Sequence, residues 1–295
     1  MAPSKSELSS RMEVDLRSSD KTGTTIPLVV ANMTAIAGRR MAETVARRGG
    51  LVVIPQDIPF VVVKDVIHYV KSRHTLFDTP ITLAPTQTVA DAASLLHKRT
   101  HGAVVIVEDN KPVGIVTEDD LNNVDRFTQL QQVMSKELTT MPDTVDPRQT
   151  FDFLNENRRT LAPVVGKNGE LVGIITKVGA LRATLYSPAV DKSGKLLIAT
   201  AVGINGDVAQ KAAKLVESGA DVIVVDTAHG HQKRTLRAIE EVRAVAPDVP
   251  IVAGNVVTAG GTRDLIDAGA DVNQWDVYGE APLFESKSAM YASSG

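Results

Sequence analysis

Few residues of this chain have the type and spacing of a catalytic or metal centre. His229 and His231 lie two apart in the segment VDTAHGH, and two imidazoles without further ligands are a weak signal, so we expect no metal there. The sequence contains no cysteine, which excludes disulfides, thiolate metal sites and sulfur nucleophiles among its residues. Ser286 and Ser288 have no recognisable catalytic neighbours that would activate a hydroxyl. We therefore predict no catalytic nucleophile in this sequence.

Composition indicates a protein that handles small molecules. The 295 residues carry a net charge of -3 at pH 7, and the sequence pI is about 6.1. Without a global basic field, neither nucleic acid nor an anionic membrane is expected as a partner of the whole chain. The polar N-terminal segment contains no apolar run of signal-peptide length, and no run of about 18 apolar residues follows. We therefore expect a cytoplasmic protein.

Short apolar runs alternate with segments of helical spacing. Their near-continuous β-branched character predicts parallel strands that are buried on both faces. The alternation of strand and helix with short loops is typical of an α/β layer or barrel. The fold prediction is therefore a partial (β/α)8 barrel with about five of the eight strands. The five predicted strands are residues 27–33, 51–56, 197–204, 221–228 and 250–256.

An internal repeat separates the second predicted strand from the third. PVGIVTEDD (112–120) is echoed by LVGIITKVG (171–179), and GAVVIVED (102–109) by LAPVVGKN (161–168), both at an offset of 59. This period is too long for a common solenoid unit. The two copies resemble a tandem pair of CBS modules, which are βαββα units that usually bind nucleotides and regulate a neighbouring domain. The predicted organisation is the first two β/α units of the barrel over 1–77, the first CBS copy over 78–133, the second over 134–185, the third to fifth barrel strands over 186–271 and an unmatched tail over 272–295.

The CBS resemblance implies a nucleotide half-site at Thr117 and Asp120. In such pairs a Ser or Thr after the last strand and an Asp three residues later hold phosphate and ribose, because a hydroxyl donates to phosphate and a carboxylate accepts from ribose hydroxyls. An adenine or guanine nucleotide is the implied ligand. The alternative interpretation is that Thr117 only caps a helix that begins at Glu118. In the second copy Thr176 is followed by Gly179, so the ribose acceptor is missing there.

The segments that flank the repeat resemble the inosine monophosphate (IMP) dehydrogenase and guanosine monophosphate (GMP) reductase family. The insertion of a CBS pair after the second strand and helix is also this family's arrangement. The first segment most resembles the branch that carries CBS domains and is assigned GMP reductase activity. The segments that carry the resemblance are ANMTAIAGRRMAETVARRGGLVVIPQD (31–57), ATAVGINGD (199–207), VDTAHGH (225–231), VAGNVVT (252–258) and DLIDAGAD (264–271).

The resemblance assigns substrate contacts to the end of the first strand. Asn32 and Met33 match the family's residues beside the purine base, although Met33 fits a place in the core equally well. The implied substrate is a purine nucleoside monophosphate. The implied reaction is the NADPH-dependent reductive deamination of GMP to IMP. The alternatives are the NAD-dependent oxidation of IMP to xanthosine monophosphate and a regulatory nucleotide-binding module without catalysis.

The resemblance assigns cofactor contacts to two later strand ends. Asp226, Thr227 and Ala228 match the segment that contacts the dinucleotide, NADPH or NAD, where an acidic side chain binds ribose hydroxyls. Gly254 and Asn255 match a Gly-Asn pair at which a missing side chain lets the backbone approach a ligand. A glycine that packs against a neighbouring strand is the alternative for Gly254.

The family's nucleophile is a cysteine that follows the DAGAD segment, and this sequence contains none. The potassium-binding loop, the last strands and the phosphate-binding loops would also lie beyond residue 271, so we expect a chain that lacks the C-terminal half of the barrel and is inactive by itself. Five strands would leave the barrel interior uncovered and its apolar strand faces exposed. The family's members form homo-oligomers, whose interfaces need the whole barrel.

Overall fold

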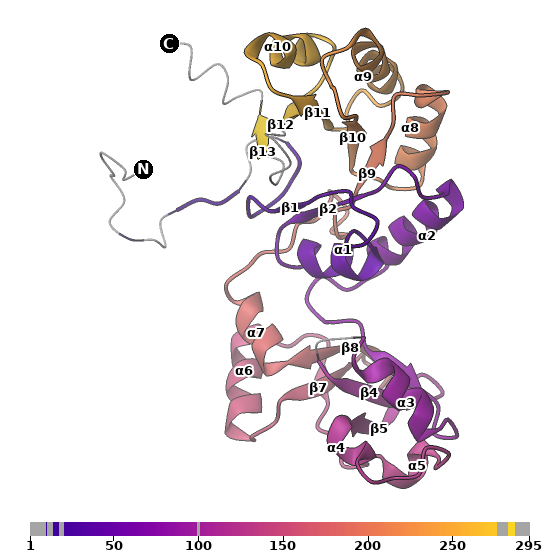
Figure 1. Cartoon of the computed structure of the whole chain (residues 1–295). Coiled ribbons are helices and arrows are strands. Elements are labelled where there is room, and N and C mark those ends of the chain that lie inside the picture. The colour runs from indigo at the N-terminus through magenta and orange to yellow at the C-terminus, as the bar shows by residue number, and fades with distance from the viewer. Residues whose placement is uncertain (1–9, 11–13, 18–20, 99–100, 276–282, 287–295) are drawn as a thin grey trace. The chain divides into compact units, whose positions relative to one another are not determined.

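The computed structural model describes residues 10, 14–17, 21–98, 101–275 and 283–286. The chain divides into two compact units, which we call unit 1 and unit 2 (Figure 1). Unit 1 comprises residues 1–73 and 188–295, and unit 2 comprises residues 74–187. Unit 2 is therefore an insertion in the chain of unit 1. Within the described residues, no helix is both long enough and apolar enough to cross a membrane.

Unit 1 is an α/β unit with a single sheet in the order β1-β2-β9-β10-β11-β12-β13. Neighbouring strands from β1 to β12 pair in parallel, and β13 pairs with β12 in antiparallel. The arrangement is that of a parallel half-barrel. The elements of unit 1 are β1 (Val29–Val30), α1 (Arg39–Ala46), β2 (Leu51–Ile54), α2 (Phe60–Lys71), β9 (Ala199–Val202), α8 (Val208–Glu217), β10 (Val222–Asp226), α9 (Lys233–Val245), β11 (Ile251–Val256), α10 (Ala259–Asp267), β12 (Val272–Trp275) and β13 (Leu283–Ser286).

The prediction of five strands, with an unmatched tail from residue 272, places the end of the sheet too early. Val272–Trp275 forms a sixth parallel strand, which pairs with β11 from Val252 onward. The segment VNQW is not predicted as a strand because Asn and Gln interrupt the apolar run that marks the other strands. Pairing with β11 satisfies the backbone groups of β12 whatever its side chains are.

Side chains of the sheet alternate between two apolar clusters. Val52 and Ile54 lie in the cluster that packs against the helices, and Leu51 and Val53 lie in the cluster on the other face. The expectation that this interior face would be exposed is wrong. Its members on β2, β9, β10 and β11 are at most 5% exposed, and Ala189 and Leu197, which lie outside the strands, join the same cluster.

An ion cluster in unit 1 lies where the chain leaves for unit 2 and returns. Lys71, the last residue of α2, places its Nζ 2.8 Å from Asp191 Oδ2 and 2.7 Å from Asp221 Oδ2. Burial raises the pKa of Asp191, but hydrogen bonds from Lys71, Ser193 and the backbone of Lys195 outweigh it and hold the pKa well below its ordinary value. Burial raises the pKa of Asp221 above its ordinary value, because the hydrogen bonds to that carboxylate offset burial only in part. Lys71 thus ties together segments on both sides of the insertion.

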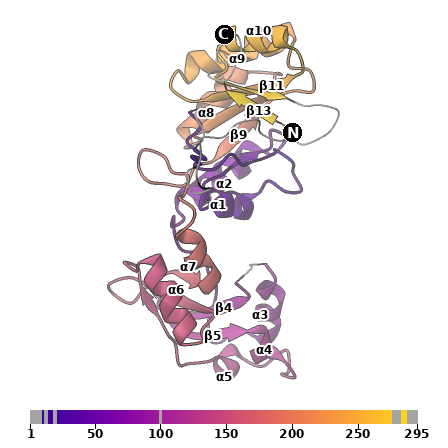
Figure 2. The ribbon, with the colours of Figure 1, turned by 90° about the vertical axis from the view of Figure 1, so that its left-hand side faces the viewer.

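Unit 2 contains two similar copies of one small fold, each with a three-stranded sheet and an apolar cluster of its own. The sheets have the orders β3-β4-β5 and β6-β7-β8, with one parallel and one antiparallel pairing in each. Figure 2 shows α6 beside α7 in the second copy. The elements of unit 2 are β3 (Ile81–Leu83), α3 (Val89–Leu96), β4 (Ala103–Glu108), β5 (Lys111–Thr117), α4 (Glu118–Leu121), α5 (Leu130–Val133), β6 (Met141–Pro142), α6 (Pro147–Glu156), β7 (Leu161–Val165), β8 (Leu171–Thr176) and α7 (Lys177–Ala183).

Short-range capping begins most helices of unit 2. Thr88 and Asp91 form a reciprocal capping box on α3, and the Asp146 side chain accepts from the backbone N–H of Gln149 at the start of α6. Thr176 caps α7 by accepting from a backbone N–H three residues later. These contacts depend on residues three apart in the sequence, so each helix start is determined locally.

Candidate functional sites

The first candidate site lies at the carboxyl ends of the strands in unit 1. Asn32 follows β1 and Asp226 ends β10, and the Asn32 Nδ2 donates to the Asp226 Oδ2 at 2.7 Å. Both side chains are half-buried. The predicted substrate contact and the predicted cofactor contact are thus hydrogen-bonded to one another.

This hydrogen bond depends on the curvature of the sheet. β1 and β10 are three positions apart in the strand order. In a flat sheet that separation is about 14 Å, since neighbouring strands lie roughly 4.8 Å apart. Two short side chains span that distance only if the strand ends converge. The half-barrel therefore already brings the ends of distant strands to one place, which is where barrels of this type build their sites.

The loop after β10 packs on the end of β11. The backbone N–H of Thr227 donates to the Gly254 carbonyl at 2.9 Å, and the N–H of Asn255 donates to the Thr227 carbonyl at 2.7 Å. Gly230 lies so close to this strand end that a Cβ there would be 2.6 Å from the Asn255 carbonyl oxygen. Gly254 is buried and forms a register pair with Asp226. This geometry agrees with the alternative in which Gly254 packs against a neighbouring strand.

Other residues singled out in the sequence are exposed. Met33 is 56% exposed, so the alternative that placed it in the core is wrong. Ala228 is exposed as well. His231 Nε2 lies 2.7 Å from Asp264 Oδ2, in a pair with α10. Within the described part of the chain, no group of three or more acidic or histidine side chains is placed to hold a metal ion.

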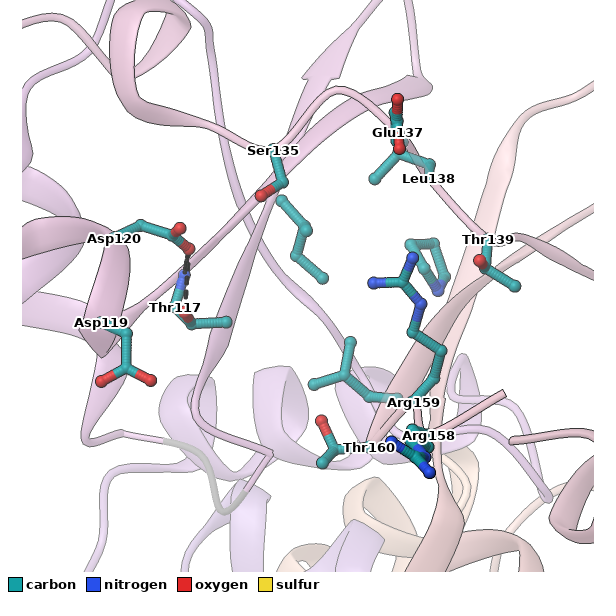
Figure 3. A pocket seen from close by; sticks show the side chains of 13 residues that line it. Thr117, Asp119, Asp120, Ser135, Glu137, Leu138, Thr139, Arg158, Arg159 and Thr160 are labelled. Carbon is teal, nitrogen blue, oxygen red and sulfur yellow. Dashed lines mark hydrogen bonds between the residues drawn. The ribbon is translucent and has the colours of Figure 1, made fainter. Parts of the chain in front are cut away.

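The second candidate site is a cavity of about 360 Å³ between the two copies of unit 2. Its wall includes Thr117 and Asp120, the predicted nucleotide half-site. Asp120 Oδ2 accepts from the backbone N–H of Thr117 at 2.7 Å and from its hydroxyl at 2.8 Å. The pair therefore forms the capping arrangement that was the alternative interpretation, and it does so at the edge of a cavity (Figure 3).

Two arginines on the opposite wall of this cavity were not predicted. Arg158 and Arg159 come from the turn before β7, so the second copy faces the Thr117 half-site of the first (Figure 3). Guanidinium groups are good partners for phosphate, because they present several donors in one plane. The Arg-Arg pair is visible in the sequence, but only the fold shows that it lies across from Thr117. Carboxylates also line the cavity, and they belong to Asp119, Asp120 and Glu137.

A parallel half-barrel that gathers polar side chains at its carboxyl edge defines a class of α/β-barrel proteins with sites at that edge. Comparison with known proteins places the chain within this class. The model of the IMP dehydrogenase / GMP reductase domain matches residues 1–275. The chain belongs to this family, and the match includes strand β12.

Similar proteins carry both names of the family. GMP reductases from Mycobacterium tuberculosis and Mycobacterium bovis are 51% identical over 272 residues, and an inosine-5'-monophosphate dehydrogenase from Halalkalibacterium halodurans is 36% identical over 279. Each match covers 92% of this chain and 57% of the relative. The chain therefore spans a little over half the length of these relatives.

A solved structure has the same architecture. The crystal structure of GMP reductase from Trypanosoma brucei in complex with guanosine 5'-triphosphate superposes with a TM-score of 0.64 at 28% identity. The match covers 94% of this chain and 69% of that one. The likeness extends over both units of the chain.

Proposed function

We propose that unit 1 is the N-terminal portion of a GMP reductase barrel, in which NADPH reduces GMP to IMP with loss of ammonia. The hydrogen bond between Asn32 and Asp226 carries the proposal, because it joins the two predicted ligand contacts at the carboxyl edge of the sheet. The higher identity to GMP reductases, 51% against 36% for an IMP dehydrogenase, favours the reductase over the dehydrogenase.

The residues at this edge fit a portion of a dinucleotide. A half-buried carboxylate at Asp226 provides an acceptor for ribose hydroxyls, and the exposed Ala228 leaves room beside it. Met33 supplies an exposed apolar side chain against which a purine base packs. When bound, the dinucleotide supplies the hydride. The residues of this chain bind and orient the dinucleotide and the purine base. None of them is a sulfur nucleophile, since the sequence has no cysteine.

A chimaeric enzyme tests the proposal. Residues 1–275 replace the matching segment of the M. tuberculosis GMP reductase, which retains its own C-terminal segment. We expect NADPH oxidation with GMP and no NAD reduction with IMP, measured by absorbance. This chain alone should give no product. Oxidation of IMP by a correctly assembled chimaera would contradict the choice of reductase.

Asp226→Asn in the same chimaera tests the assigned contact. Loss of the charged acceptor should raise the KM for NADPH about tenfold with a smaller change in the KM for GMP, because hydrogen bonds to charged groups contribute roughly 1.5–3 kcal/mol. Asp267→Asn, an exposed carboxylate on α10, is the matched control and should leave both constants unchanged. An unchanged KM for NADPH in Asp226→Asn would remove Asp226 from the cofactor site.

We further propose that unit 2 is a CBS pair that binds an adenine or guanine nucleotide in the cavity at Thr117 and Asp120. The support is the composition of the cavity, where carboxylates and hydroxyls of one copy face two arginines of the other. Calorimetric titration of the chain with ATP, GTP and their monophosphates should detect binding. Asp120→Ala should abolish it at this site. No heat with any of these nucleotides would refute the proposal.

A further inference from the structure

The two copies in unit 2 exchange the segments that precede their first strands. Ser135, which precedes β6, the first strand of the second copy, bridges to Ile115 on β5 of the first copy. Asp78, which precedes β3, the first strand of the first copy, bridges to Ile174 on β8 of the second copy. Ile115 and Ile174 are separated by the repeat offset of 59. By strand pairing, Asp78 therefore takes the place in the second copy that Ser135 takes in the first.

The packing of two glycines supports the same equivalence. A Cβ at Gly114 would contact the side chain of Met134, the residue before Ser135. A Cβ at Gly173 would lie 2.6 Å from the Cβ of Phe77, the residue before Asp78. Gly114 and Gly173 are again 59 residues apart. Met134 and Phe77 thus occupy matching places, and Ser135 and Asp78 follow them.

Ser135 lines the cavity of the first half-site together with Asp120. In the second copy the residue that corresponds to Asp120 is Gly179, which has no side chain. The carboxylate of Asp78 nevertheless lies close to Gly179. A Cβ at position 179 would lie 3.7 Å from Asp78 Oδ2 and 2.8 Å from Thr176 Oγ1. The first half-site therefore has an acid at Asp120 and a small residue at Ser135. The second has the small residue at Gly179 and the acid at Asp78.

We propose that Asp78 supplies the ribose acceptor of a second nucleotide half-site, which Thr176 completes and for which Gly179 leaves room. The proposal rests on the proposed function of unit 2 as a nucleotide-binding pair. Position 179 has a glycine where the first copy has Asp120, and Asp78 supplies the carboxylate from another segment instead. The chain then binds two nucleotides, one at each copy.

The second half-site contains the same two kinds of group as the first, a threonine hydroxyl and a carboxylate. The carboxylate of Asp78 accepts from the two hydroxyls of a ribose. Thr176 Oγ1 accepts from the backbone N–H of Gly179 at 2.8 Å. Its hydroxyl can also donate, and a phosphate oxygen is a suitable acceptor. The ligand class is a purine nucleotide with an intact ribose diol. An analogue without these hydroxyls loses the partners of Asp78.

Calorimetric stoichiometry with ATP and with GTP tests the proposal on the full chain. The parent should bind two nucleotides per chain. Asp120→Asn and Asp78→Asn should each retain one site, and the double variant none. 2′,3′-Dideoxy-ATP should bind at least tenfold more weakly than ATP at the site that remains in Asp120→Asn. Glu108→Gln, an exposed carboxylate on β4, is the matched control and should retain both sites.

A rescue variant separates loss of the acceptor from damage to the fold. Gly179→Asp in the Asp78→Asn background places a carboxylate three residues after Thr176, as Asp120 follows Thr117, and should restore the second site. Two sites of unchanged affinity in Asp78→Asn would overturn the proposal. A parent with one site that Asp120→Asn abolishes would also overturn it, while leaving the first half-site intact. Absence of any binding in the parent would instead refute the nucleotide function of unit 2.

Discussion

Two carboxylates at the candidate sites are held in opposite ways. Asp226 in unit 1 accepts at 2.7 Å from Asn32, which is 194 residues away in the sequence. Asp120 in unit 2 accepts at 2.7 Å from Thr117, three residues away. The first arrangement exists only when the sheet of unit 1 is assembled, whereas the second forms with one turn of chain. A change that loosens the sheet of unit 1 should therefore break the hydrogen bond between Asn32 and Asp226. The hydrogen bond between Thr117 and Asp120 needs only one turn of chain and should persist when unit 2 is loosened.

A similar contrast separates the ion cluster of unit 1 from the helix caps of unit 2. Lys71 joins Asp191 and Asp221 across 120 and 150 residues, whereas the helix caps of unit 2 join residues three apart. Unit 2 has two copies of one small fold, whereas the described strands of unit 1 form a single sheet. Substitutions in the long-range contacts should therefore destabilise unit 1 without affecting unit 2.

The largest difference is expected from Lys71→Ala. The substitution leaves Asp191 and Asp221 facing one another with little exposure and no cation, which costs about 3 kcal/mol in comparable buried pairs. Hydrogen exchange by mass spectrometry should show faster exchange throughout unit 1 and unchanged exchange in unit 2. Lys64→Ala, an exposed lysine on the same helix, should change neither unit. Equal acceleration in both units would show that they do not unfold independently.

Acid pH gives the next effect. The pKa of Asp191 is lower in the folded protein than its ordinary value, so its stabilisation is complete above about pH 4 and is lost as the pH falls through the folded pKa. The pKa of Asp221 is raised, so its protonation as the pH falls favours the folded state and opposes that loss. Asp191→Asn should therefore destabilise unit 1 by about 1.5 kcal/mol at pH 7.

The pH dependence of this difference is the sharper measurement. The free energies of unfolding of the parent and of Asp191→Asn, obtained from urea titrations, should differ by a constant amount between about pH 5 and pH 8 and converge below about pH 4. Ser193→Ala removes one hydrogen bond to Asp191 but keeps the charge, so it should show a smaller and less pH-dependent effect. A difference that grows on acidification would assign the effect to Asp221 instead.

Local patterns in the sequence predicted the features of the fold that local contacts determine. The apolar runs located five parallel strands. The structure also contains the helix cap at Thr117 and Asp120, which was the alternative to a nucleotide half-site. The resemblance to the family, confirmed by the match to residues 1–275, came from contiguous segments of sequence, several of which include the end of a strand. Strand β12 was missed because its pairing, and not its apolar character, defines it.

Contacts between distant residues could not be read from the sequence. No pattern joins Asn32 to Asp226, since their meeting depends on the curvature of four strands. In the sequence, Arg158 and Arg159 resemble any basic turn. Only the packing of the two copies of unit 2 shows that they line the same cavity as Thr117. The burial of the interior face of unit 1 also contradicted the expectation from strand number, because residues outside the strands join that cluster.

The smallest effect distinguishes two roles for Asn32. The resemblance assigns Asn32 to the purine base, but its Nδ2 donates to the carboxylate of Asp226, the predicted cofactor contact. A residue that positions Asp226 affects cofactor binding, and one that touches the base affects GMP. In the chimaera, Asn32→Ala should therefore raise the KM for NADPH about fivefold, which corresponds to roughly 1 kcal/mol for one hydrogen bond, with kcat and the KM for GMP nearly unchanged.

Combining this variant with Asp226→Asn completes the argument. If Asn32 acts only through Asp226, the double variant should show the same KM for NADPH as Asp226→Asn alone, because the amide then has no carboxylate to orient. Asn205→Ala, which removes an exposed amide after β9, should leave both constants unchanged. A rise in the KM for GMP alone would return Asn32 to the substrate, and the long-range hydrogen bond of unit 1 would then be a structural contact without effect on the cofactor.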